Sequence, residues 1–256
     1  MITQANAFLL GYRKTALEKL FKATFMRSRA EMNDGACELG MLQCLIPPGS
    51  TTVDVGANVG DFSRRLSQLS QGGLVIAVEP QSMPRSVLTM AGFFKKASNI
   101  LVVPVALGDT HGLTVLSIPI KTKGNVGIGV AHIGDAADFS GRFEVKKELV
   151  SLTTLDALLA RIQTGPVSFI KIDVEGGELA VLRGAEATID RFRPAILCEI
   201  DDREARFGTT RSELVNFLVE RDYIPRRISD LAELAPDEIE KNTVFVPREA
   251  VIPSRS

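Results

Sequence analysis

The sequence is poor in the residues that build metal sites and disulfide frameworks. Its 256 residues include three cysteines (Cys37, Cys44 and Cys198), two histidines and no tryptophan. Three cysteines without a C-x-x-C pair cannot form a disulfide framework, and they do not indicate a structural zinc site. Such cysteine usage is typical of proteins in a reducing compartment. We therefore expect a cytoplasmic protein without a metal.

An excess of charge and long apolar runs are absent as well. Lysine and arginine number 30 and aspartate and glutamate 31, and the net charge of −1 gives no general reason to bind nucleic acid. No run approaches the roughly 18 apolar residues of a membrane-spanning helix, and polar residues interrupt the stretch where a secretory leader would be apolar. With 45% hydrophobic residues, the chain is expected to be soluble and to form one large domain, or one domain with an appendage.

The first 30 residues are unusually basic, with six lysines and arginines against one glutamate. Apolar residues between Leu17 and Phe25 recur with helical spacing, so we expect an N-terminal helical extension over residues 1–48. The basic helix would pack on the domain through its apolar face. Alternatively, residues 12–29 would contact an anionic membrane surface or a phosphorylated substrate.

From residue 51 onward, short β-rich segments alternate with helical periodicity. Strands are expected at residues 51–55, 74–78, 100–105, 167–172, 195–200 and 243–246, and helices at 61–69, 82–94, 178–189, 212–221 and 230–240. Apolar strands alternating with helices predict a parallel sheet covered on both faces. We therefore predict an α/β, doubly wound, mostly parallel (Rossmann-like) fold for a domain of residues 49–250.

The interval 110–150 breaks this alternation. Two strands are expected at residues 113–118 and 143–152, on either side of a glycine-rich stretch at 124–129. The segment is predicted to be a β-hairpin insertion, and its long loop is either a plain connection or a lid that binds the acceptor. His132 lies in this loop. Its side chain is a candidate general base by its intrinsic pKa, or it has no catalytic role.

A glycine-containing turn follows the first predicted strand and precedes a helix. Such a turn brings main-chain N–H groups and a helix N-terminus to a ligand at the carboxyl edge of the sheet. A dinucleotide-binding G-x-G-x-x-G motif would need glycine at Asn58, so the turn disfavours NAD. The carboxylate of Asp54 repels phosphate and suits an ammonium group. A ligand with an amino-acid end and no phosphate, S-adenosylmethionine, meets both conditions. The predicted contacts are Asp54, Gly56, Ala57, Asn58 and Gly60.

Two later strand ends add to the same predicted ligand site. Glu79 ends the second strand, where a carboxylate can accept hydrogen bonds from both hydroxyls of a ribose. Ala106 to Asp109 follow the third strand and are expected to border the adenine. Asp109 either accepts a hydrogen bond from the exocyclic amine of the adenine or simply forms the turn into the next strand.

Five segments in this order resemble the FkbM family of S-adenosylmethionine-dependent methyltransferases, which have the class I methyltransferase fold. They are VDVGANVG at 53–60, VEP at 78–80, ALGD at 106–109, TLD at 154–156 and FIKIDVEGGE at 169–178. The resemblance covers about residues 49–202, and Gly177 stands where the family usually has alanine. It implies methylation of a hydroxyl oxygen on a sugar, polysaccharide or polyketide-like acceptor.

Asp173 and Glu175 follow the fourth strand of the predicted sheet and are the candidate catalytic residues. Methyl transfer requires alignment of the acceptor oxygen and removal of its proton. One carboxylate would bind the amino group of the cofactor or the acceptor and the other would take the proton, and their proximity would raise one pKa. Alternatively, the pair holds a divalent cation, or Asp173 caps the following helix. Lys171 on the same strand is expected to pair with Glu199 on the next.

Three other functions share parts of this pattern. A catalytically silent S-adenosylmethionine-binding protein would need only the cofactor residues. An NAD-dependent oxidoreductase is disfavoured by Asn58, and a nucleic-acid methyltransferase is disfavoured by the net charge and by the lack of an N/D-P-P-Y/F segment.

Overall fold

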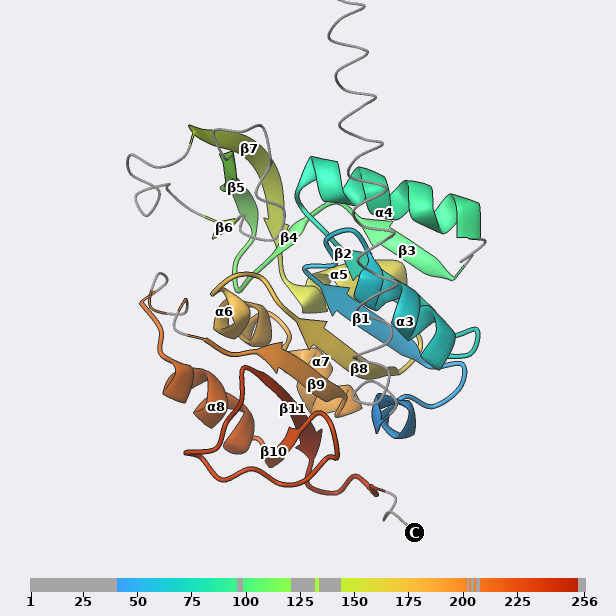
Figure 1. Ribbon diagram of the computed structural model, residues 1–256, viewed down its shortest axis with the longest axis vertical. Helices are drawn as coiled ribbons and strands as arrows, with labels where there is room; N and C mark the ends of the chain where they lie inside the picture. Colours follow the sequence, from blue (N-terminus) through green and yellow to red (C-terminus); the bar gives the residue numbers. More distant parts are fainter. Residues whose placement is uncertain are drawn as a thin grey trace, which may run out of the picture.

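The computed structural model describes residues 41–95, 99–120, 132–133, 144–201, 203, 205 and 208–252 (Figure 1). The predicted basic helix, nearly all of the predicted N-terminal extension and the glycine-rich stretch at 124–129 lie outside these residues. Among the described residues, no helix is both long and apolar enough to cross a membrane.

The main sheet has seven strands in the order β10-β11-β9-β8-β1-β2-β3. Five of them run parallel: β1 (Thr51–Val55), β2 (Val75–Val78), β3 (Ile100–Val103), β8 (Val167–Ile172) and β9 (Ala195–Glu199). β11 (Asn242–Pro247) is antiparallel to β9, and β10 (Tyr223–Arg227) is antiparallel to β11. The predicted doubly wound, mostly parallel sheet is confirmed, and its strand order reverses direction at β1, where such sheets bind their ligands.

Helices cover both faces of this sheet because its strands are apolar on both sides (Figure 1). Val53 and Val55 of β1 pack with α5 (Leu155–Ile162), α6 (Glu178–Arg183), α7 (Glu186–Phe192) and α8 (Arg211–Val219). The opposite face packs against the 3-10 helix η1 (Met41–Leu45), α3 (Asp61–Leu69) and α4 (Ser82–Lys95). On that second face, Asp54 and Lys171 are charged side chains in a mostly apolar layer.

A second, four-stranded sheet has the order β4-β7-β5-β6. Its long strands β5 (Gly112–Ile120) and β7 (Glu144–Thr153) pair antiparallel over most of their length, as expected for a hairpin. β4 (Ala106–Leu107) and β6 (His132–Ile133) complete the sheet at its edges. Leu116 of β5 and Ile133 of β6 line the cavity described below, so this sheet supplies one of its walls.

Two predictions of local structure are wrong, and one strand was missed. The predicted helix at 178–189 is two helices, α6 and α7, separated at Gly184. A Cβ atom there would lie 1.9 Å from the carbonyl oxygen of Gly108, so the chain bends where two backbones touch. The predicted helix at 230–240 is a series of turns with one bridge between Arg226 and Glu233. β10 was not predicted because it contains Pro225, which the edge position of this strand tolerates.

Candidate active site

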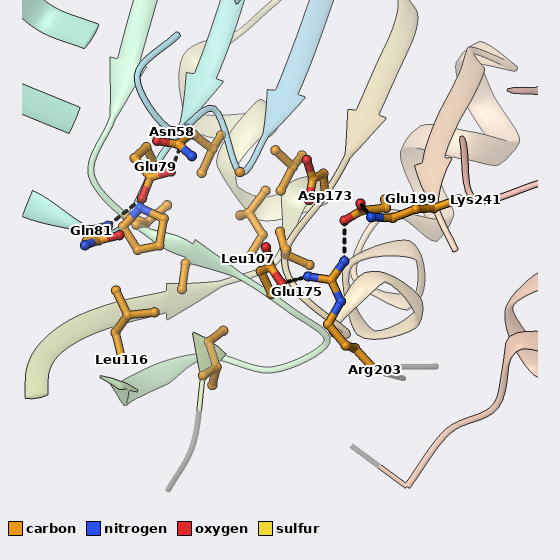
Figure 2. Close-up of a pocket in the computed structure, with 18 residues that line it drawn as sticks. Asn58, Glu79, Gln81, Leu107, Leu116, Asp173, Glu175, Glu199, Arg203 and Lys241 are labelled. Atoms are coloured by element: carbon orange, nitrogen blue, oxygen red, sulfur yellow. Dashed lines mark hydrogen bonds and ion pairs between the residues drawn. The ribbon is translucent and has the colours of Figure 1, made fainter. Parts of the chain in front are cut away.

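A cavity of about 380 Å³ lies at the carboxyl ends of the parallel strands (Figure 2). Its polar part is contributed by the ends of β1, β2, β8 and β9 and by the residue just before β11. Its apolar part comes from the ends of β1, β2 and β8, from the segment after β3 and from the second sheet. The residues that line it are Val55, Gly56, Asn58, Val78, Glu79, Pro80, Gln81, Val105, Ala106, Leu107, Leu116, Ile133, Asp173, Val174, Glu175, Glu199, Arg203 and Lys241.

The turn after β1 touches the end of β8 at Gly56. This residue has a φ of 77°, and a Cβ atom on it would lie 1.9 Å from the carbonyl oxygen of Asp173. Only glycine meets both conditions, since a side chain would disfavour the φ angle and collide with a fixed backbone oxygen. The turn and the residues after β8 are therefore held at van der Waals contact. Any ligand of the turn lies close to Asp173.

Glu79 is held at the end of β2 by backbone groups. Its Oε2 accepts a hydrogen bond from the N–H of Asn58 and its Oε1 one from the N–H of Gln81, each at 2.7 Å. The residue is 6% exposed, and burial raises the pKa of its carboxyl to about 7 although both N–H groups act to lower it. Asn58 has a φ of 50°, and its buried Oδ1 finds no hydrogen-bond partner among the described residues.

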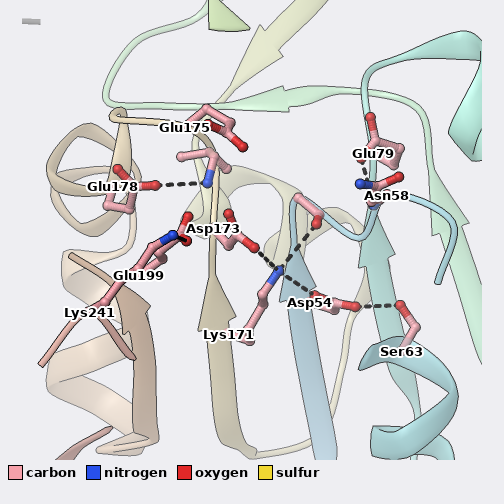
Figure 3. A network of polar contacts seen from close by, with 12 residues as sticks. Asp54, Asn58, Ser63, Glu79, Lys171, Asp173, Glu175, Glu178, Glu199 and Lys241 are labelled. Atoms are coloured by element: carbon pink, nitrogen blue, oxygen red, sulfur yellow. Dashed lines mark hydrogen bonds and ion pairs between the residues drawn. The ribbon is translucent and has the colours of Figure 1, made fainter. Parts of the chain in front are cut away.

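Below the turn, a row of charged groups crosses from β1 to β8 (Figure 3). Asp54 is fully buried, and its Oδ2 accepts a hydrogen bond of 2.5 Å from Ser63 Oγ. Lys171 Nζ lies 3.6 Å from Asp54 Oδ1 and 3.1 Å from Asp173 Oδ2, and it donates to the carbonyl oxygen of Gly56 at 3.3 Å. Lys171 therefore joins the glycine turn to the carboxylate that follows β8.

The predicted Lys171–Glu199 pair is wrong as a direct contact. Asp54 and Lys171 are register partners in adjacent parallel strands, so both side chains leave the same face of the sheet. Burial acts to lower the pKa of Lys171, but the carboxylates of Asp54 and Asp173 outweigh it and the pKa is raised. Burial raises the pKa of Asp54, against the opposing effect of Lys171.

Three carboxyl groups meet on the other side of the cavity. Asp173, Glu175 and Glu199 each have one carboxylate oxygen within 4.8 Å of the others. Burial acts to raise the pKa of Asp173, but Lys171, Glu199 and Arg203 together outweigh it and the pKa is lowered. Burial, followed by a hydrogen bond with Asp173, raises the pKa of Glu199 to about 7. The sequence predicted that Asp173 and Glu175 would raise one pKa between them. The pKa of Asp173 is instead lowered, and the carboxyl group with the raised pKa is Glu199.

Two cations neutralise part of this negative charge. Arg203 forms an ion pair with Glu175 and donates from Nη2 to Glu199 Oε2 at 3.0 Å (Figure 2). Lys241 Nζ lies 2.5 Å from Glu199 Oε1. Glu175 has a φ of 66°, a left-handed conformation that costs energy in a residue with a side chain. The ion pair with Arg203 fixes the Glu175 carboxylate at the cavity wall.

The structure brings some of the predicted residues together and leaves others apart. Gly56, Asn58, Glu79, Ala106, Asp173 and Glu175 line the cavity. Asp54, Ala57, Gly60 and Asp109 do not. Ala57 is a core residue, and Gly60 begins α3 where a Cβ atom would lie 2.2 Å from Leu88 Cδ1. Asp109 is exposed beyond the cavity, which favours the turn interpretation.

Two further predictions concern Asp173 as a helix cap and His132 as a general base. Asp173 is not a helix cap, because α6 begins at Glu178 with Gly177 as its N-cap. Instead, the buried carboxylate of Glu178 accepts a hydrogen bond of 2.9 Å from the N–H of Val174 and stabilises the loop after β8. His132 lies in β6, where its backbone pairs with that of Ser117 in β5. The side chain of His132 lies outside the described part of the chain. Its role as a base stays a prediction.

Arg203 and Lys241 were missed in the sequence. Arg203 lies four residues after the end of β9, so the same strand-end argument that found Asp173 could have found it. Lys241 precedes β11, and the start of a strand reaches this edge only because β11 runs antiparallel to β9. The local sequence pattern of β11 does not tell in which direction the strand runs.

Comparisons with known proteins point to one family. The model of the methyltransferase FkbM domain matches residues 54–225. A curated relative, the AMB antimetabolite synthetase AmbE of Pseudomonas aeruginosa, is 23% identical over 205 residues, which are 69% of this chain and 10% of that protein. The chain thus spans about a tenth of the length of this relative.

Two solved structures are similar to this chain. A methyltransferase FkbM from Methylobacillus flagellatus KT superposes with a TM-score of 0.50 at 19% identity, over 77% of this chain and 43% of that chain. A fibrillarin of Aeropyrum pernix, solved with natively bound S-adenosyl-L-methionine, has a TM-score of 0.42 at 14% identity, over 78% and 66% of the two chains. At 19% identity, the similarity to the methyltransferase FkbM structure shows only that this chain has the same fold.

Proposed function

The chain belongs to the FkbM family of methyltransferases, and from this premise we propose that it transfers a methyl group from S-adenosylmethionine to a hydroxyl oxygen. S-adenosylmethionine is the cofactor of this family, as the sequence predicted. We also propose that the acceptor of the methyl group is a hydroxyl oxygen of a sugar, a polysaccharide or a polyketide-like compound. The observation that carries it is the cavity itself, which has a backbone-anchored carboxylate on one side and a carboxyl cluster on the other.

The residues of the cavity fit this cofactor. Glu79 uses one lone pair of each oxygen on a backbone N–H, so both oxygens can still accept a hydroxyl of a ribose. The unpaired Oδ1 of Asn58 is an acceptor that a donor on the ligand would satisfy. Ala106 and Leu107 offer small apolar surface for an adenine ring. When bound, S-adenosylmethionine supplies a methyl group on a positively charged sulfur.

Asp54 acts indirectly in this proposal. The sequence predicted a contact between its carboxylate and the ammonium group of the cofactor, but Asp54 is fully buried beneath the turn. Its carboxylate instead holds Lys171, and Lys171 holds both the carbonyl of Gly56 and the carboxylate of Asp173. Asp173, which lines the cavity and stays ionised, is the better partner for an ammonium group.

The chemistry needs few groups from the protein. The hydroxyl oxygen forms a bond to the methyl carbon as the carbon–sulfur bond breaks, and the electron pair of that bond stays on sulfur. The hydroxyl proton passes to a carboxylate of the cluster. Asp173 and Glu175 remain candidates for orienting the acceptor, and His132 remains a candidate base on the second sheet. The proposed acceptor is uncharged at the reacting end, since the carboxyl cluster would repel a phosphate placed there.

Calorimetric titration with S-adenosylmethionine and S-adenosylhomocysteine tests the cofactor site, with NAD as the control ligand and Glu79→Gln as the variant. Removing a charged acceptor of two hydroxyls should weaken both adenosyl ligands by roughly tenfold or more. Binding of NAD alone would contradict the proposal.

Transfer of a labelled methyl group to a panel of monosaccharides, oligosaccharides and polyketide-like alcohols tests the acceptor. Base-stable ether products are expected. Labelled amines or thiols in place of ethers would exclude O-methylation, and cofactor binding without transfer to any acceptor would favour the silent binding protein.

A further inference from the structure

We propose that Glu148 is a positioning residue for the adenosine part of S-adenosylmethionine. It lies on β7 of the second sheet and does not line the cavity itself. By binding the start of α4, it holds the second sheet where Leu116 and Ile133 form an apolar wall of the cavity. The inference rests on the proposed function through its cofactor, and it adds a residue that touches neither the cofactor nor the acceptor.

Glu148 joins the second sheet to α4 through both of its carboxylate oxygens. Its Oε2 accepts a hydrogen bond of 3.0 Å from the backbone N–H of Ser82, and its Oε1 accepts one of 2.6 Å from the Ser82 hydroxyl. Ser82 is the first residue of α4, where N–H groups lack partners within the helix and the helix dipole favours a negative charge. The side chain of Glu148 is 15% exposed. This largely buried contact links two elements through residues that lie 66 positions apart in the sequence.

The pairing of the second sheet places Glu148 in one row with the apolar wall. Leu116 of β5 is the register partner of Glu148 on β7 and of Ile133 on β6. Directly opposed residues of antiparallel strands project from the same face of a sheet, so the three side chains share one face. Glu148 binds α4 at one end of this row, and the other two residues line the cavity. Because ladder hydrogen bonds join the strands, the position of Glu148 determines that of the wall.

The start of α4 also borders the proposed ribose site. Ser82 follows Gln81, whose N–H donates to Glu79 Oε1 at 2.7 Å. Two successive N–H groups therefore bind two carboxylates, Glu79 at the cavity and Glu148 on the second sheet. In Figure 2, Leu116 lies on the side of the cavity that holds Glu79 and Gln81. The wall thus stands beside the carboxylate proposed to bind the ribose, where it contacts the adenosine part of the cofactor.

Methyl NMR of the ligand-free protein tests the anchor. In protein labelled with ¹³C at leucine and isoleucine methyl groups, the signals lost in Leu116→Ala and Ile133→Ala identify the wall. Both signals should shift in Glu148→Ala and return toward their wild-type positions in Glu148→Gln, whose amide can accept from the N–H of Ser82 and donate to its hydroxyl. Lys146→Met is the control, since it removes an exposed cation beside Glu148 and leaves both bonds to Ser82. Wall signals that stay in place in Glu148→Ala would refute the anchor.

Calorimetric titration with S-adenosylhomocysteine measures the effect on the cofactor site. Glu148→Ala should weaken binding about tenfold, which corresponds to a wall that is in place in about one molecule in ten. The loss should be less than about threefold in Glu148→Gln, because the amide keeps the contact with α4, and Lys146→Met should stay within about twofold of wild type. A loss in Glu148→Gln as large as in Glu148→Ala would overturn the role of the contact.

A double-variant cycle separates positioning from a general loss of stability. Leu116→Ala removes part of the wall itself, so Glu148→Ala should weaken S-adenosylhomocysteine much less in that background than in the wild type. Ser82→Ala removes one of the two bonds and replaces Glu148→Ala in the cycle if that variant does not fold. Additive losses would refute the proposal. If S-adenosylhomocysteine does not bind the wild-type protein, the proposed function fails, whereas the methyl signals decide separately whether Glu148 holds the second sheet.

Discussion

On the β1–β2 side of the cavity, formed by Gly56, Asn58, Glu79 and Gln81, polar groups are held by the backbone. On the β8–β9 side, formed by Asp173, Glu175, Glu199, Arg203 and Lys241, side chains hold one another through ion pairs. The first side comes from a stretch of under 30 residues, and the second brings together residues from three separate strand ends. The β1–β2 side is therefore a preformed binding surface. The β8–β9 side is an arrangement of charges, which we expect to respond to pH and to ligands.

The difference also determines what a mutation does on each side. A backbone-held group is lost when the turn changes shape, because its hydrogen bonds come from N–H groups that move together. An ion-paired group keeps its position only while its partners keep their charges. We therefore expect glycine substitutions to disrupt the first side and charge-neutralising substitutions to disrupt the second.

The largest effect is expected from Lys171→Met, because Lys171 links the two sides. The substitution leaves the carboxylate of Asp54 buried without its cation, which should destabilise the fold by about 3–5 kcal/mol. Chemical denaturation measures the change. Lys241→Met is the matched control, since its side chain is 58% exposed and its ion pair should contribute less than about 1 kcal/mol.

A double variant sharpens this prediction. Asp54→Asn combined with Lys171→Met removes both charges, so it should recover much of the lost stability. If Lys171→Met were as stable as Lys241→Met, the row of charges would not hold the two sides together.

The next effect concerns the contact between turn and strand. Gly56→Ala places a methyl group against the carbonyl oxygen of Asp173, whereas Gly49→Ala has a similar φ of 75° and no atom within 4 Å. The left-handed conformation alone should cost Gly49→Ala about 1–2 kcal/mol. Gly56→Ala should cost more and abolish detectable binding of S-adenosylmethionine. Equal melting temperatures and equal affinities for the two variants would show that the close contact is unimportant.

A smaller effect is expected from the pH dependence of Glu79. The folded protein raises the pKa of this carboxyl from 4.5 to about 7, so the folded state holds a proton that the unfolded chain releases. The group therefore stabilises the fold below pH 4.5 and loses this contribution as pH rises to about 7.

Glu79→Gln removes that dependence. Relative to wild type, the variant should gain up to on the order of 3 kcal/mol of stability between pH 4 and pH 8. Denaturation curves at several pH values measure the difference. A constant difference between the two proteins would mean that Glu79 titrates as an ordinary glutamate.

The smallest effect should follow from Asp109→Ala. Asp109 is exposed and does not line the cavity, so the affinity for S-adenosylmethionine should stay within about twofold. Ala106→Leu is the comparison variant, because Ala106 lines the cavity and is only 2% exposed. The larger side chain should fill part of the cavity and weaken binding of S-adenosylmethionine. A large loss in Asp109→Ala would restore the predicted hydrogen bond to the adenine.

Much of the first side could be predicted from the sequence because its parts are contiguous. The turn after β1 and the carboxylate at the end of β2 follow from glycine positions and strand ends. The partner of Lys171 could not be predicted, since strand periodicity does not tell which of two neighbouring strands, β1 or β9, supplies a carboxylate at the same level. The break at Gly184 depends on a contact with Gly108, which lies far away in the sequence.

The sequence by itself determined the family, the alternation of strands and helices, the glycine turn and the carboxylates that follow β2 and β8. These features depend on periodicity and on short motifs, which do not require knowledge of neighbours. The tertiary structure alone decided which carboxyl groups have a raised pKa and which cations surround them. A pKa depends on burial and on charges within a few ångströms, and here those charges come from strands whose order and direction only the folded sheet defines.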